Sequence, residues 1–419
     1  MRRAVLVVCD GHRADFVSPE LTPNICSLGA RGRYFARHSS VFPSVTRVAS
    51  ASIATGCRPA KHGLHGNTMA LDEGDGLVLR DVGHPDFRSR MRRATGGTLR
   101  VPTLAQLVAG HGGQIVFSNV SPGAAFFQDP DGYGYVYHRD GCYGPGESVV
   151  TDPLTVSHDA AGDRVMAERF CREVLRDRRP TVAVLWLCEP DHTMHASELG
   201  SPQHLQAVKD ADACVGLVSA AVDALIAEGD EILMMVGSDH GQETVGETIR
   251  ADACLVEAGL KVSLDSTDVV IAPQGFSGLV YCAPDLGDRP QRILDFLGRQ
   301  DWVGDVVPGN DLRRIGMAPD NRLAGAFTLR RGAATNGYGV PGHSLLVAAS
   351  SDGRTKQGLG SHGGLGRWEQ HPFLLAYGTG VAQAGEILFE TSIVDIAPTI
   401  LGHLQLSGSG FDGQPLALA

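Results

Sequence analysis

The stretch EILMMVGSDHG at residues 231–241 decides how this chain folds. Its apolar run, residues 231–236, is short and stops at Gly237, which is typical of a buried strand in the centre of a parallel sheet. Asp239 and His240 follow at once. In open α/β sheets, ligands bind beyond the carboxyl ends of the strands, so chemistry is expected at these two side chains.

Two further apolar runs lead to side chains of the same kind, and a glycine-rich turn carries another. They are Asp10 after the run 5–9, Asp191 and His195 after the run 182–187, and His362 in the turn 358–364. Together with Asp239 and His240, six carboxylate and imidazole side chains come from distant parts of the chain. We expect all six at one edge of one sheet.

The fold class that follows is α/β, with a mostly parallel sheet flanked by helices and a smaller inserted cap. A long amphipathic helix is predicted over 202–227, and the main sheet is predicted to return at 344–349 and 372–377. With 419 residues, the chain is long for one ordinary domain. We therefore predict a catalytic core at 1–243 and 342–419, with residues 244–341 as the inserted cap subdomain.

Composition excludes some classes of protein. A formal charge of -11 argues against a surface that coats nucleic acid, because such surfaces need clustered Lys and Arg. The nine cysteines form no Cys-x-x-Cys pair and are expected as free thiols. The sequence has no signal-peptide pattern and no run of about 18 apolar residues that would span a membrane. A cytoplasmic protein is expected.

The types of the six side chains indicate metal binding. Asp191 and His195 are four residues apart, so they share one helical face and can hold the same ion. Three Asp and three His make two mixed oxygen and nitrogen sites, which are the ligand types that zinc prefers among the common catalytic metals. Two metals are the usual arrangement for in-line displacement at phosphorus.

Thr46 is the candidate nucleophile. It stands between VFPSV (41–45) and a run of small, helix-compatible residues, and therefore at the expected start of a helix. The free backbone N–H groups and the dipole of a helix start favour an anion there. A metal can hold a hydroxyl as its alkoxide, which Thr cannot become unaided near neutral pH.

These features occur together with several short motifs that span positions 10 to 399. The motifs are Asp10-Gly11, Pro43-Ser44-Val45-Thr46, Thr55-Gly56 with Pro59 and His62-Gly63, Glu189-Pro190-Asp191 with His195, Ser238-Asp239-His240-Gly241, Ser361-His362-Gly363 and Val394-Asp395-Ile396-Ala397-Pro398-Thr399. In this order they resemble the alkaline phosphatase superfamily. The branch they resemble contains nucleotide pyrophosphatase/phosphodiesterases and phosphonoacetate hydrolases.

The resemblance implies the division of the ligands and the mechanism. It implies one zinc on Asp191, His195 and His362, and a second on Asp10, Asp239 and His240 with the Thr46 oxygen. Manganese or iron are alternatives to zinc in both sites. In the family pattern, Thr46 attacks phosphorus to give a phosphothreonine, which water then cleaves.

One position departs from the pattern. Diesterases of this branch carry a motif similar to Thr-Phe-Pro-Asn at the nucleophile, and the Asn of that motif holds a phosphoryl oxygen. This chain reads Thr46-Arg47-Val48-Ala49 instead. Two residues are candidates for the missing substrate contact. Arg47 offers a cation, and Asn67 offers an amide.

Several functions stay open from the sequence. The first is a zinc-dependent phosphodiesterase or pyrophosphatase. A phosphonoacetate hydrolase that cleaves a C–P bond comes second, a phosphomonoesterase third, and a catalytically inactive metal-dependent sensor last. A cation that clamps a substrate carboxylate would favour the second, and the candidates are Lys61, Lys261, Arg330, Arg331 and Lys356.

The partners expected from the sequence are few. The main one is a small phosphorylated or phosphonate substrate. No nucleic-acid polymer and no membrane are expected, and a homodimer is the possible assembly. His192, His371 and Trp368 flank the ligand segments and are further candidates for the wall of the pocket.

Overall fold

A computed structural model describes residues 1–348, 356–382 and 385–419 of the chain. The fold is mixed α/β and is built on a sheet of ten strands. In spatial order these are β21 (Gly385–Ile387), β2 (Arg33–Phe35), β20 (Leu374–Gly378), β11 (Glu231–Gly237), β1 (Arg2–Cys9), β10 (Val182–Leu187), β6 (Gln114–Ser118), β7 (Tyr135–His138), β8 (Gly141–Gly144) and β9 (Ser148–Val149).

The centre of the sheet is parallel. Strands β11, β1, β10, β6 and β7 pair in parallel, while β20 runs antiparallel to β11. In the register, Val7 of β1 lies opposite Leu185 of β10 and Val236 of β11, so the three strands end at the same level. The predicted fold class is confirmed, and the predicted strand at 372–377 is β20.

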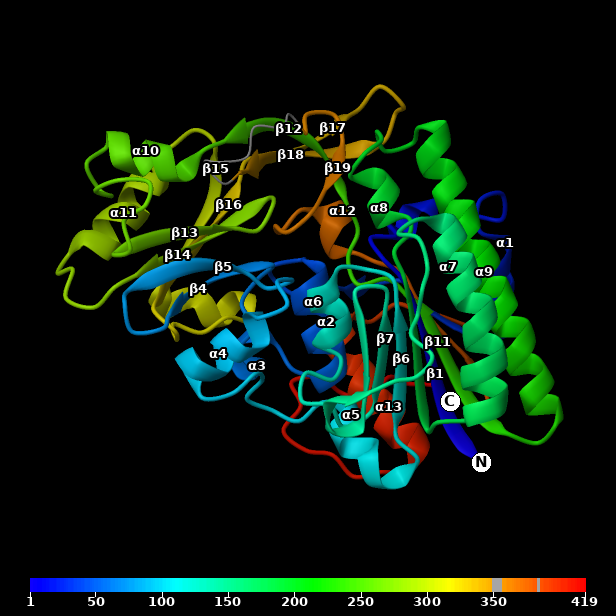
Figure 1. The fold of residues 1–419 in the computed structure, drawn as a ribbon. Coiled ribbons are helices and arrows are strands. Elements are labelled where there is room, and N and C mark those ends of the chain that lie inside the picture. Colours follow the sequence, from blue (N-terminus) through cyan, green and yellow to red (C-terminus); the bar gives the residue numbers. More distant parts are fainter. Residues whose placement is uncertain (349–355, 383–384) are drawn as a thin grey trace.

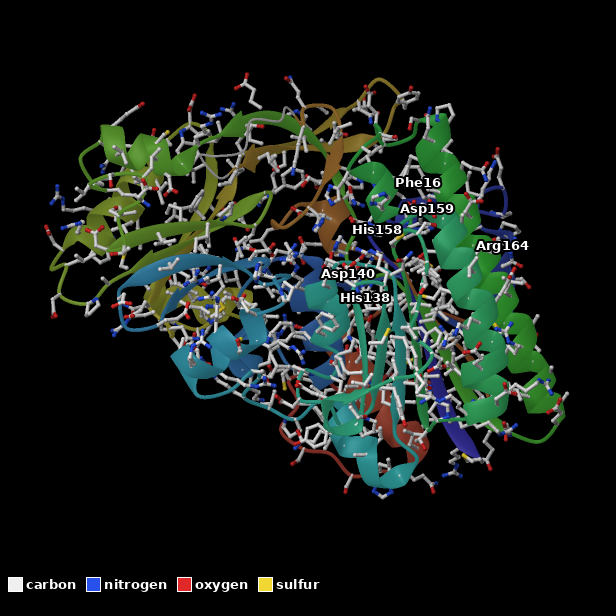
Figure 2. All side chains as sticks on the ribbon, viewed as in Figure 1. Phe16, His138, Asp140, His158, Asp159 and Arg164 are labelled. Carbon is white, nitrogen blue, oxygen red and sulfur yellow. The ribbon has the colours of Figure 1, made fainter. Side chains whose placement is uncertain are left out.

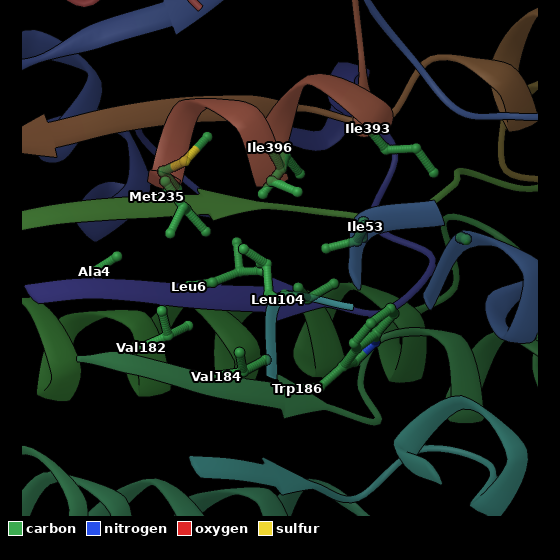
Figure 3. Packing of buried hydrophobic residues seen from close by; sticks show 14 of the residues in the cluster. Ala4, Leu6, Ile53, Leu104, Val182, Val184, Trp186, Met235, Ile393 and Ile396 are labelled. Carbon is green, nitrogen blue, oxygen red and sulfur yellow. The ribbon is translucent and has the colours of Figure 1, made fainter. Parts of the chain in front are cut away.

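Side chains of β1 alternate between two hydrophobic clusters, as a strand buried on both faces requires. Ala4, Leu6 and Val8 pack into one cluster, and the intervening residues Val5, Val7 and Cys9 pack into the other. Figure 3 shows Leu6 beside Met235 of β11 and Val184 of β10, beneath the helix that carries Ile396.

Helices cover both faces of this sheet (Figure 1). One face is covered by α1 (Pro23–Arg31), α7 (Ala160–Arg169), which continues helically as Phe170–Arg178, and α9 (Pro202–Ala227). The other is covered by α2 (Thr46–Thr55), α5 (Leu104–Val108), α6 (Pro122–Phe126) and α13 (Ile396–Leu404). The helix predicted over 202–227 is confirmed as α9.

Two further sheets have four strands each. The first has the order β17 (Arg331–Thr335), β18 (Pro341–Val347), β12 (Glu243–Ile249) and β19 (Gly360–Ser361). The second has the order β13 (Val269–Pro273), β14 (Ser277–Cys282), β16 (Leu323–Leu329) and β15 (Val303–Pro308), and α10 (Ala251–Glu257) and α11 (Arg289–Leu297) pack into its core. The predicted domain limits stay a prediction.

The strand expected at 344–349 was assigned to the wrong sheet. It is β18, which pairs with β12 and β17 and not with any strand of the ten-stranded sheet. Its predicted last residue, Ala349, lies outside the described residues. An apolar run is buried equally well by either sheet, so its periodicity cannot tell which sheet it joins.

A hairpin and a helix complete the surroundings of the site. They are β4 (Thr68–Asp72), β5 (Leu77–Asp81) and α4 (Phe87–Thr95), and they share a core with β14 through Met69, Phe87 and Tyr281. None of the nine cysteines, all of which are described, forms a disulfide. Among the described residues, no helix is long and apolar enough to cross a membrane.

Candidate metal centre and active site

Three adjacent strands of the main sheet deliver carboxylates to one place. Asp10 follows β1, Asp239 follows β11, and Asp191 begins α8 (Asp191–Met194) just after β10. Gly11 lets these segments approach closely, because a Cβ on it would lie 3.0 Å from the Cβ of Asp191. The gathering expected at the carboxyl ends of the strands is therefore present.

His362 reaches this place from another direction. It follows β19, which pairs with β12 in the first four-stranded sheet, so the expectation of a single sheet edge for all six side chains is wrong. The residues of a glycine-rich turn show no hydrophobic periodicity, so the sequence does not indicate which sheet the turn joins. Two sheets, not one, thus supply the ligand candidates.

The first group of ligand candidates is Asp191, His195 and His362, whose ligand atoms all lie within 4.8 Å of one another. His195 Nε2 lies 3.4 Å from Asp191 Oδ2, and His362 Nε2 lies 3.7 Å from Asp191 Oδ1. The His195 side chain is 37% exposed, so this group faces solvent.

The second group is deeper in the protein. Ligand atoms of Asp10, Asp191 and His240 lie within 4.8 Å of one another, and Asp239 Oδ2 lies 3.2 Å from His240 Nε2. His240 Nε2 also lies 3.6 Å from Asp10 Oδ1. Since Asp191 belongs to both groups, the two are adjacent, and one carboxylate contacts the ligands of each. The division of ligands between two ions stays a prediction.

All three imidazoles are held in the orientation that metal binding needs. Nδ1 lies against a backbone carbonyl oxygen in each: Gly360 for His195 at 3.1 Å, Gly241 for His240 at 2.9 Å, and Ser44 for His362 at 2.7 Å. A ring that donates from Nδ1 presents the lone pair of Nε2, and here every Nε2 points at the carboxylates.

The electrostatics of the centre favour a cation. Asp10 Oδ1 and Asp239 Oδ2 are buried and accept no hydrogen bond from any described residue. Burial, together with the neighbouring carboxylates of Asp239 and Asp191, raises the pKa of Asp10 well above its usual range. Burial also raises the pKa of Asp239. Divalent cations would offset these clustered negative charges, so the residues present fit the metals that the sequence predicts.

Thr46 lies in the same cluster. It is the first residue of α2, as predicted, and it is buried. Its Oγ1 lies 3.1 Å from His240 Nε2. The nucleophile candidate therefore meets the second group of ligands at the N-terminal end of a ten-residue helix, where the dipole favours an anion.

Asn67 and Arg47 both lie next to Thr46 but make different contacts. The Asn67 Oδ1 accepts a hydrogen bond from the Arg47 backbone N–H at 3.3 Å, and Asn67 lines the cavity in front of His195 and His362. The Arg47 guanidinium pairs with Asp81 and donates to the backbone carbonyl oxygen of Asn67 at 2.7 Å. Asn67 thus faces the site, while the cation of Arg47 is paired with a carboxylate.

Other flanking residues are distributed differently. His192 packs against His158, with the ring centroids 4.1 Å apart and the rings tilted by 43°. Burial lowers the pKa of His158 to about 4. Figure 2 shows His158 at the start of α7, at the same end of the main sheet as His138. Sequence reasoning missed His158 because no local pattern links it to residue 192. Trp368 and His371 line a separate cavity of about 660 Å³, whose lining includes none of the ligand candidates.

Comparisons with known proteins identify a family and a shared fold. The family model for type I phosphodiesterase / nucleotide pyrophosphatase matches residues 4–289. Two solved structures of murine ectonucleotide pyrophosphatase/phosphodiesterase 5 share the fold. One of them is of an inactive variant in complex with AMP. They superpose with TM-scores of 0.71 and 0.70, at 18% identity, covering 99% of this chain and 98% of theirs. No curated protein sequence matches.

Proposed function

The chain belongs to the type I phosphodiesterase / nucleotide pyrophosphatase family, and we propose that it is a two-metal phosphodiesterase with Thr46 as its nucleophile. The substrate would be a small phosphodiester or pyrophosphate. The observation that carries the proposal is the position of Thr46 Oγ1, 3.1 Å from His240 Nε2 within a cluster of buried carboxylates and oriented imidazoles. Cytoplasmic localisation and a homodimer stay predictions from the sequence.

The residues that would hold the metals are those predicted. Asp191, His195 and His362 would hold one ion, and Asp10, Asp239 and His240 the other, with zinc favoured by the mixture of oxygen and nitrogen donors. Bound divalent ions supply Lewis acidity and neutralise charge on phosphoryl oxygens. Backbone carbonyls at Nδ1 of each histidine keep Nε2 directed inward.

Thr46 would carry the covalent chemistry. Its Oγ1 gives up its proton and forms a bond to phosphorus as the bond from phosphorus to the leaving oxygen breaks. The leaving oxygen takes up a proton, and a phosphothreonine remains. Water then attacks that phosphorus, and the bond to Thr46 Oγ1 breaks to regenerate the hydroxyl. The net reaction is hydrolysis of one ester or anhydride bond.

Asn67 is the stronger of the two candidates for the phosphoryl contact. Its Oδ1 is occupied by the backbone N–H of Arg47, which leaves the Nδ2 donors for an oxygen in the adjoining cavity. We assign to Arg47 a positioning role, because its guanidinium ties the Asn67 carbonyl to Asp81. Removing a single donor to a developing oxyanion costs about 10²–10³ in kcat, and that loss is expected for Asn67→Ala.

The test is hydrolysis by zinc-loaded protein of three substrates side by side: a phosphodiester, a phosphomonoester and phosphonoacetate. Thr46→Ala and Thr46→Ser are the matched variants, since both remove the methyl group and only Ser keeps the hydroxyl. We expect the diester to be hydrolysed fastest. The rate should fall by at least about 10³ in Thr46→Ala, in line with the loss of a covalent nucleophile, and much less in Thr46→Ser.

Other outcomes would reassign the protein. Preference for phosphonoacetate would make it a C–P bond hydrolase, and preference for the monoester a phosphomonoesterase. A diester rate that Thr46→Ala leaves unchanged would contradict the nucleophile. A chelator that has no effect on the wild-type rate would contradict the role of the metals.

A further inference from the structure

A cavity of about 300 Å³ lies directly in front of the metal centre. One wall is the centre itself, with Val45, Asn67, His195 and His362. The rest of the lining comes from the turn between β13 and β14 with Gln274, from the end of β18, and from Lys356. A substrate whose phosphoryl group is held at the centre would have this cavity for its remaining part, and Lys356 lines it.

Hydrogen bonds join the turn between β13 and β14 to the residues of the centre. The Phe276 N–H donates to the His362 carbonyl oxygen at 3.1 Å, and the Ser277 hydroxyl donates to the Gly363 carbonyl oxygen. The Asn67 N–H donates to Gln274 Oε1 at 2.7 Å. A cavity whose two walls are joined in this way keeps its shape without a ligand, which lowers the cost of binding one.

Lys356 is the one cation of the five sequence candidates that reaches this cavity. The others make contacts elsewhere: Lys61 with Asp412 at 2.8 Å, Lys261 with Asp252 at 3.3 Å, Arg331 with Asp305 at 3.0 Å, and Arg330 with the Asp301 carbonyl oxygen at 2.7 Å. None of the described residues that line the cavity is acidic.

The rest of the lining does not suit a nucleobase. None of the described lining residues is Phe, Tyr or Trp, so the cavity has no aromatic platform on which a base could stack. The side chains in the lining that can donate to a small anion, besides Lys356, are the Asn67 amide and the Ser361 hydroxyl. The Gln274 amide is already engaged, because its Nε2 donates to the Thr68 carbonyl oxygen at 2.7 Å.

We propose that Lys356 binds a second, compact anionic group of the substrate, a carboxylate or a phosphate attached close to the reacting phosphorus. This inference rests on the proposed function, because it takes the phosphoryl site to be at Thr46. Lys356 then selects small substrates with two anionic groups over substrates whose second group is neutral. It also disfavours nucleotides whose binding depends on base stacking.

The experiment measures binding without chemistry, by calorimetry on zinc-loaded Thr46→Ala protein. The three ligands share one phosphonate group and differ in the second group. This group is a carboxylate in phosphonoacetate, a second phosphonate in methylenediphosphonate and a neutral ketone in acetonylphosphonate. We expect at least one of the two dianions to bind about tenfold more tightly than the ketone, as a charge-assisted hydrogen bond provides. The tighter of the two identifies the second group.

Matched variants test the role of Lys356. In Thr46→Ala/Lys356→Met the preference for the dianion should disappear, and in Thr46→Ala/Lys356→Arg it should persist. Removal of zinc by a chelating ligand would affect the Met and Arg variants alike, so the difference between them reports the charge. The melting temperatures of both should match that of Thr46→Ala, which shows that the variants fold.

The two proposals can fail separately. Equal affinity for all three ligands, or a preference that survives Lys356→Met, would overturn the role of Lys356 while leaving Thr46-dependent hydrolysis intact. A preference that depends on Lys356 in a protein without Thr46-dependent turnover would leave the anion site standing and overturn the proposed reaction.

Discussion

The hydroxyl of Ser44 donates a hydrogen bond of 2.9 Å to Oε2 of Glu369, which joins the segment before the nucleophile to the loop after His362. Glu369 lies on α12 (Arg367–Gln370), is completely buried, and also accepts the N–H groups of Gly364 and Gly366 at 2.7 Å. With the bond from His362 Nδ1 to the Ser44 carbonyl oxygen, these contacts set the distance between Thr46 and His362.

Glu369→Gln should destabilise the protein and slow the reaction. An amide offers one acceptor oxygen where the carboxylate offered two, so a buried N–H loses its partner at a cost of about 1–3 kcal/mol. The free energy of unfolding from urea titration checks this. Glu390→Gln is the control, because Glu390 is 81% exposed, and it should change stability by less than about 0.5 kcal/mol. Equal effects of the two variants would contradict the anchoring role.

Asp191→Asn should weaken both metal sites, because Asp191 belongs to both groups of ligand candidates. We expect about two zinc ions per chain in the wild type, less than about one in Asp191→Asn, and about one in His195→Gln, which alters one group only. Metal analysis after gel filtration measures this. Loss of both ions in His195→Gln would show that the groups do not bind independently.

Gly275→Ala should be strongly destabilising. Gly275 has φ +80°, and a Cβ on it would lie 2.0 Å from the carbonyl oxygen of His362. The left-handed backbone alone costs about 1–2 kcal/mol for other residues, and the collision adds to it. Gly29→Ala in α1 is the control, since no atom lies within 4 Å of its added Cβ, and it should stabilise the helix by about 0.5–1 kcal/mol. A neutral Gly275→Ala would mean that the turn between β13 and β14 shifts freely.

His62 should make the protein sensitive to acid. It is fully buried, accepts the Leu64 N–H at Nδ1 and contacts the Ser52 hydroxyl through Nε2, and burial lowers its pKa to about 3. The unfolded chain binds a proton near pH 6.5 and the native state does not, so stability falls as the pH drops from about 6.5 toward 3. Between pH 7.5 and pH 5 this group should cost about 2 kcal/mol.

His62→Gln provides the comparison, since Gln can also donate to Ser52 and accept from Leu64 but does not titrate. Urea titrations at pH 7.5 and pH 5 should show a smaller difference in the variant than in the wild type, by about the same 2 kcal/mol. An unchanged pH dependence would assign the acid sensitivity to other buried histidines, such as His38, whose pKa burial lowers to about 3.

Much of this protein could be read from local sequence. The short apolar runs before Asp10, Asp191 and Asp239 predict parallel strands whose ends carry ligands, because strand length and side-chain alternation are local properties. The same holds for the helix that begins at Thr46 and for the helix 202–227. The residue types at these ends then indicate the chemistry, since carboxylates and imidazoles select divalent metals.

What the sequence could not decide are contacts between segments far apart in the chain. Three such contacts depend on how whole layers pack. The first is the sheet that β18 joins, and the second is the place of Asp191 in both ligand groups. The third is that Arg47 pairs with Asp81 while Asn67 faces the cavity. Of the five Lys and Arg residues that the sequence offers as candidates for a carboxylate clamp, only Lys356 lines the cavity. Periodicity determines which elements form and which face each one buries, but only tertiary packing determines which side chains of different elements meet, because that depends on the relative placement of surfaces that share no local pattern.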